Sequence, residues 1–187
     1  FSFKSADYIE HSNTLNIRMS SIRPDGNFDS EYNKKYLPDS YAHKYEEFSL
    51  KEGDLIIAMT DMASDPKILG IPTVVAGLAG RTFLLNQRVG KLNNFSRSIH
   101  APYLCQFLVS NFIRDYYKKK GVGGLQINLS KKDILSAPLA IPPLEEQMLI
   151  DERLNGAEKI KKTNAESNKK IEELQSSILQ RAFRGEL

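Results

Sequence analysis

The chain has 187 residues, of which 41% are hydrophobic and 26% are charged. This balance is typical of a folded globular protein, and the length suits one domain with an appendage. The composition excludes an intrinsically disordered chain, and the apolar runs are too short for a membrane-spanning helix, which needs about 20 residues.

The net charge of +3 is mild and unevenly spread. Residues 1–144 hold 18 Lys and Arg against 14 Asp and Glu, a net of +4, whereas residues 145–187 hold 8 against 9, a net of −1. We therefore expect the first part to be the better binder of a polyanion. The single cysteine, Cys105, excludes an internal disulfide, fits a reducing cytoplasm and, in its apolar stretch, is interpreted as a packing residue rather than a nucleophile. The chain begins at Phe1 without a signal-peptide pattern, and we expect further residues upstream.

Short apolar segments, separated by Gly, Pro, Asn and Asp, fill the chain before residue 140. Their length and composition predict strands at 15–19, 54–59, 73–75 and 81–85. Apolar positions at helical spacing predict one helix over 102–120, with Pro102 in its first turn and Gly121 after its last lysines. These elements together predict a compact α+β domain over residues 1–143.

Two consecutive prolines, Pro142 and Pro143, mark a boundary because they cannot continue a helix or a central strand. Between them and Gly185 the only helix-breaking residue is Gly156, so residues 144–187 are predicted to form one long helix. Steps of three and four residues trace a coiled-coil seam, which includes the polar residues Arg153 and Ser167. The residues expected to pair with a partner helix are Ile150, Ala157, Ile160, Asn164, Ile171, Leu174 and Ile178. The alternative is that the helix lies back on its own domain.

The motifs of several enzyme classes are missing from the sequence. No Glu-x-Lys of a metal-dependent nuclease occurs, Pro142-Pro143 lacks the Asn or Asp and the aromatic residue of an adenine methyltransferase motif, and the glycines at 121–124 are not followed by the lysine of a phosphate-binding loop. The three histidines are far apart, and the carboxylates of Asp54, Asp61 and Asp65 fit turn chemistry or capping better than a metal site. We expect no catalytic residue, metal or cofactor in this chain.

Three groups of residues, in order along the chain, resemble motifs of one family. Residues 53–58 (GDLIIA) resemble a turn-and-strand element written GDIL, and residues 85–92 (LNQRVGKL) are similar to a strand written NQRVGRL. The third group is 124–130 (GLQINLS), followed by 141–147 (IPPLEEQ) and the ending 179–187 (LQRAFRGEL). On these residues the chain resembles the specificity subunit of type I restriction-modification systems.

The resemblance implies that residues 1–143 are a target-recognition domain that reads one half of a split double-stranded DNA target. Residues 144–187 would be the conserved spacer and dimerisation helix. The subunit itself would be a cytoplasmic, non-catalytic protein, working with methyltransferase subunits that use S-adenosylmethionine and restriction subunits that use ATP and Mg²⁺. Complete subunits carry two recognition domains and two helices, so this chain is either part of a longer subunit or a half-subunit that pairs through its helix, for example as a homodimer.

Lysine and arginine suit DNA phosphates or guanine, and Asn suits adenine. At Lys118, Lys119, Lys120 and Gly123 we weigh phosphate contacts against simple completion of a helix end. For Arg23, Asn93 and Arg97, on polar segments, we weigh base contacts against ordinary surface loops. For Gln87 and Arg88, the resemblance suggests structural or phosphate-positioning roles. Lys91, in the same motif, is a further candidate DNA contact. A different function, that of a coiled-coil assembly adaptor without nucleic-acid binding, is the alternative.

Overall fold

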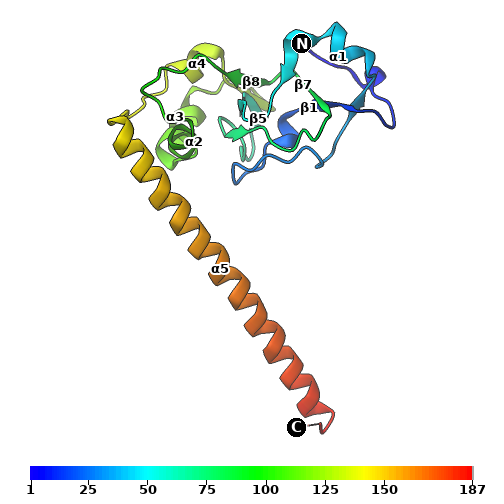
Figure 1. The fold of residues 1–187 in the computed structure, drawn as a ribbon, viewed down its shortest axis with the longest axis vertical. Helices are drawn as coiled ribbons and strands as arrows, with labels where there is room; N and C mark the ends of the chain where they lie inside the picture. The colour runs from blue at the N-terminus through cyan, green and yellow to red at the C-terminus, as the bar shows by residue number, and fades with distance from the viewer. Residues whose placement is uncertain (187) are drawn as a thin grey trace. The chain divides into compact units, whose positions relative to one another are not determined.

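The computed structural model describes residues 1–186, and Leu187, the last residue of the predicted helix segment, lies outside the described residues. The chain divides into two compact units, residues 1–141 and residues 142–187. The first is a mixed α+β unit, and the second consists mainly of one helix, α5 (Leu144–Phe183) (Figure 1). The predicted fold class, an α+β domain followed by a long helix, is confirmed.

Strands in the first unit are short and form three small sheets. The largest has the order β2-β1-β7-β3, in which β1 and β7 run parallel with Leu15 opposite Phe83. The second has the order β6-β4-β8 and is antiparallel, and the third pairs β5 with β9. The strands are β1 (Thr14–Ile17), β2 (Tyr36–Leu37), β3 (Ser49–Leu50), β4 (Leu55–Ala58), β5 (Thr60–Met62), β6 (Pro72–Val74), β7 (Thr82–Leu85), β8 (Val89–Leu92) and β9 (Gln126–Asn128).

Met59, the residue between β4 and β5, joins the second sheet to the third. Its N–H donates to the carbonyl of Arg88 at 2.8 Å, and its carbonyl accepts from the N–H of Leu129 at 2.8 Å. The chain just before β8 and the chain just after β9 are therefore bonded to the same residue.

The predicted helix over 102–120 is wrong in one respect, because two helices occupy this segment. They are α2 (Ala101–Leu108) and α3 (Asn111–Lys120). Ser110 between them is extended, at φ −61° and ψ 149°, and its hydroxyl accepts from the N–H of Ile113, so it caps α3. The remaining helices are the 3₁₀ turns η1 (Ser5–Asp7), η2 (Met19–Ser21) and η3 (Glu46–Phe48), with α1 (Ser40–Lys44) and α4 (Lys131–Leu135).

The apolar core is divided between the sheets and the helices. One cluster packs between the first two sheets around Leu15, Ile56 and Phe83, and a second packs α2 and α3 against Ile57 and Leu69. In Figure 1, α2, α3 and α4 gather at one end of the first unit, and β1, β7 and α1 lie at the other. The short strands between them position the loops described below.

The ring of Tyr117 occupies the centre of the helical cluster. It is fully buried, and burial raises the pKa of its phenol to about 12. It lies against Gly70, whose φ is +71°, and a β-carbon at Gly70 would fall inside the van der Waals contact of the ring. Gly70 therefore meets two requirements, a left-handed backbone and a close approach.

Helix α5 is held mainly by its own backbone hydrogen bonds. Every residue from 152 to 186 is exposed. Gln147 Nε2 donates to the Pro142 carbonyl at 2.7 Å near its start, and Gly185, at φ +71°, follows its end at Phe183. No helix in residues 1–186 is both long and apolar enough to cross a membrane.

We predict that Gly70→Ala lowers the free energy of unfolding by about 2–4 kcal/mol, because overpacking against Tyr117 adds to backbone strain. Gly77→Ala is the matched control, since Gly77 has a φ of +74° but open space around its Cα. It should lose only about 1–2 kcal/mol. Urea unfolding of both variants checks the difference, and equal losses would contradict the packing role of Gly70.

Candidate nucleic-acid interface

Residues 86–88 form a turn between the first and second sheets, so the motif over 85–92 consists of a strand end, a turn and a second strand. β7 ends at Leu85 and β8 begins at Val89. Asn86 fixes the turn, since its side-chain Oδ1 accepts from the N–H of Phe3 at 3.2 Å and its own N–H donates to Ile17. Arg88 has a φ of 72°, which turns the chain sharply.

The side chains of Gln87 and Arg88 point outward from this turn and are exposed. Arg88 Nη1 donates to Gln126 Oε1 on β9 at 2.8 Å, which keeps the guanidinium beside the third sheet. The same turn borders a recess of about 340 Å³. The lining residues are Arg18, Met19, Ser20, Asn86, Gln87 and Arg88.

Arg18 also lines this recess and was not among the predicted residues. Its Nη2 donates to the carbonyl of Asn33 at 2.5 Å, and among residues 1–186 its buried Nε has no acceptor. Gln126 was also missed. Neither residue stands out in the sequence, because each gains its position only from the pairing of strands that are distant along the chain.

The lysines at 118–120 end helix α3 and are exposed. The chain then turns back on itself, since Val122 and Asn128 exchange backbone hydrogen bonds at 3.1 and 3.0 Å. Gly123 has a φ of +148°, and a β-carbon there would overlap the carbonyl of Gln126. The structure thus explains the glycine by the turn itself, which follows the three lysines at the end of α3.

The other predicted residues differ in whether their side chains already have partners within the domain. Lys91 Nζ lies 2.6 Å from Asp54 Oδ2 in a partly buried ion pair, so it is committed to an internal partner. Asn93 and Arg97 are exposed on the segment between β8 and α2. Arg23 lies elsewhere, with its guanidinium carbon 3.7 Å from the centre of the Tyr32 ring.

The acidic residues considered as metal ligands have structural roles. Asp61 Oδ2 accepts from the N–H groups of Ile68 and Leu69 at 2.5 and 3.1 Å, and Asp54 is paired with Lys91. Asp65 forms an exposed ion pair with Lys67. Within residues 1–186, no group of three or more His, Cys, Asp or Glu is placed to hold a metal ion.

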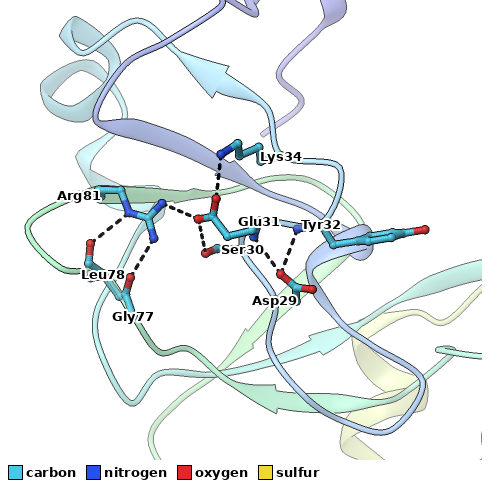
Figure 2. Close-up of polar contacts among 8 residues, drawn as sticks. All are labelled: Asp29, Ser30, Glu31, Tyr32, Lys34, Gly77, Leu78 and Arg81. Atoms are coloured by element: carbon cyan, nitrogen blue, oxygen red, sulfur yellow. Dashed lines mark hydrogen bonds and ion pairs between the residues drawn. The ribbon is translucent and has the colours of Figure 1, made fainter. Parts of the chain in front are cut away.

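Glu31 ties the loop before β2 to the loop before β7 (Figure 2). Its carboxylate contacts Lys34 Nζ at 2.8 Å and Arg81 Nη1 at 2.6 Å. Arg81 also donates to the carbonyls of Gly77 and Leu78. Hydrogen bonds from Lys34 and Arg81 lower the pKa of Glu31 to about 2.

The fold and these loops define the class of the molecule, an α+β domain that presents arginine, lysine and amide side chains on short loops and carries a long exposed helix. The family model for the type I restriction modification DNA specificity domain matches residues 9–174. The chain belongs to this family.

Two relatives and one solved structure are similar to this chain, the solved structure in its fold. The MjaVIII type I restriction enzyme specificity subunit of Methanocaldococcus jannaschii is 27% identical over 153 residues, which cover 81% of this chain and 35% of that subunit. The EcoEI specificity subunit of Escherichia coli is 24% identical over 122 residues, 64% of this chain and 20% of that subunit. A solved chain from a study of the assembly and conformational transition of the type I R-M system shares the fold, with a TM-score of 0.63 at 21% identity. The match covers 100% of this chain and 42% of the solved one, so this chain spans less than half of each of these proteins.

We predict that Glu31→Gln changes the pH dependence of stability. The folded pKa of Glu31, about 2, is below its ordinary value of 4.5, so its contribution is complete above about pH 4.5 and is lost as the pH falls toward 2. Because the pair is largely exposed, the variant should lose at most about 1 kcal/mol at pH 7. Urea unfolding at pH 7, 5 and 3 should show the difference from wild type shrinking with acid. Glu10→Gln, at an exposed glutamate, serves as the control, and a difference that does not depend on pH would contradict the prediction.

Proposed function

We propose that this chain is a DNA-binding specificity module of a type I restriction-modification complex, which reads one half of a bipartite double-stranded target. The family match over residues 9–174 is the observation that carries the proposal. The exposed cations and amides of the first unit support it, because phosphate contacts need lysine and arginine and base edges need polar side chains with several donors.

In this proposal, residues 1–143 form the target-recognition domain and residues 144–187 the spacer and dimerisation helix. The separation of the chain into compact units at residues 141 and 142 supports this division. The chain itself supplies recognition without catalysis. Methyl transfer with S-adenosylmethionine and DNA cleavage with ATP and Mg²⁺ then belong to methyltransferase and restriction subunits that bind the same complex.

The exposed seam of α5 supports a second recognition half as a partner. Ile160 is 64% exposed and Leu174 is 61% exposed, although both are large apolar side chains. An apolar stripe on an otherwise polar helix, here interrupted by Arg153, Asn164 and Ser167, is stabilised when it packs on another helix. We propose that this partner is a second recognition half, either another copy of the chain or a second half of a longer subunit.

We predict that the full chain binds duplex DNA with a steep dependence on salt, measured by fluorescence anisotropy from low to moderate ionic strength. Replacing Lys118, Lys119 and Lys120 with Ala should weaken binding on all sequences and reduce the slope of log K against log salt by about 2–3. The matched control replaces Lys161, Lys162 and Lys170, three exposed lysines of α5, and should leave the slope unchanged. Salt-independent behaviour of the wild-type chain, or no binding, would instead favour the assembly adaptor.

We predict that the wild-type chain is a dimer by light scattering and becomes monomeric when Ile160, Ile171 and Leu174 are replaced with Glu. Three charges buried between two paired α5 helices remove the apolar contact that holds the helices together. The control carries three Glu residues off the seam, at positions 155, 165 and 176. A wild-type chain that is monomeric at high concentration would contradict pairing between copies of this chain.

A further inference from the structure

The segment 21–32 runs from the end of η2 toward β2. It forms a stiff loop that is distinct from the recess lined by Arg88. Ile22 and Phe28 pair across it as an antiparallel bridge, and both are anchored in the core cluster between the first two sheets. Arg23 closes the turn, since its N–H donates to the Asn27 carbonyl at 3.0 Å and its carbonyl accepts from Gly26 at 2.9 Å. Gly26, at φ +83°, permits this tight return.

Arg23 is held at the edge of this loop by Tyr32. Its guanidinium carbon lies 3.7 Å from the ring centre, which is the distance of a stacked cation–π pair. Tyr32 is 51% exposed, so the stack is at the surface and is not part of the core. Among residues 1–186, no ion pair or hydrogen bond engages the Arg23 side chain, so its donors remain available.

The position of Tyr32 is fixed by the network that Figure 2 shows. Asp29 Oδ1 accepts from the N–H groups of Glu31 and Tyr32, both at 3.0 Å, and the Asp29 N–H donates to Ser21 at 2.9 Å. Glu31 is in turn held by Arg81 at 2.6 Å. The ring that supports Arg23 is therefore connected to the sheet through two carboxylates, and little side-chain freedom remains to be lost on binding.

The surroundings of Arg23 suit a base edge better than a phosphate. A recess of about 480 Å³ is lined by Arg23, Pro24, Asp25, Asn27, Phe28 and Asp29. Two carboxylates next to one guanidinium repel a phosphate, whereas base edges in the major groove offer both donors and acceptors. The Asn27 amide is already bonded to Asp25 Oδ2 at 2.7 Å, which leaves Arg23 as the main donor.

We propose that Arg23, stacked on Tyr32, is a specificity-determining residue that reads guanine through its O6 and N7 atoms in the major groove. A planar guanidinium presents two parallel donors to these acceptors, and the stack on Tyr32 fixes the plane in which they lie. This role rests on the proposed function of the chain as a DNA-binding specificity module. It differs from the phosphate contacts proposed for the lysines at 118–120.

The test selects binding sites from randomised duplexes with the full chain at low salt. Wild type should enrich a motif that contains guanine at one defined position. Arg23→Ala should lose the preference at that position alone, bind the selected duplex about 10- to 100-fold more weakly, and keep the same salt slope. Arg23→Lys keeps the charge without the planar fork and should show most of the same loss of preference. Tyr32→Leu should lose part of the guanine preference, as Arg23→Ala does. Tyr32→Phe keeps the ring and should show the wild-type preference.

Two results overturn the inference while leaving the proposed function intact. One is an Arg23→Ala motif identical to that of wild type. The other is a uniform loss of affinity on every sequence with a salt slope lower by about one, which identifies a phosphate contact. A wild-type chain that binds no duplex overturns the proposed function and this role together. Urea unfolding of each variant identifies any loss that comes from misfolding.

Discussion

The two backbone hydrogen bonds of Met59 are the constraint on which the arrangement of the candidate interface depends. This one residue between β4 and β5 donates to the carbonyl of Arg88 and accepts from the N–H of Leu129. Because backbone groups buried in a fold must find partners, Met59 holds the start of β8 and the end of β9 at a fixed separation. The side chains of Arg88 and Gln126 meet as a consequence.

The two proposed DNA contacts are built on different physical principles. Around Arg88 and the lysines at 118–120, exposed cations lie on strand and helix ends that the fold holds by backbone hydrogen bonds. At the other site, Arg81 holds Glu31, and Asp29 accepts from the N–H of Tyr32. These contacts position the Tyr32 ring under the Arg23 guanidinium. The first arrangement suits the phosphate backbone, which is uniform, and the second suits one base, which has to be met at a fixed angle. The rigidity of the loop 21–32 limits the conformational entropy lost on binding.

The sequence was sufficient for elements whose signal is local. Helix α5 follows from a long segment without proline, and the strands around Ile56 and Phe83 follow from short apolar runs. The break between α2 and α3 was missed because the apolar spacing continues across Ser110, whose hydroxyl caps the second helix. The pairing of Lys91 with Asp54 depends on the register of β4 against β8. The stack of Arg23 on Tyr32 depends on a cap from Asp29. Neither contact has a spacing that a sequence pattern reveals.

Hydrogen exchange of the full chain with and without a selected duplex tests the account most directly. DNA should slow exchange in the loop 21–32, the turn 86–88 and the segment 118–126. The aromatic cluster of Phe3, Tyr41 and Tyr45, packed against Leu37 and Leu84 of the first sheet, should exchange at the same rate in both states. Protection confined to α5, or to that aromatic cluster, would contradict DNA reading by these loops.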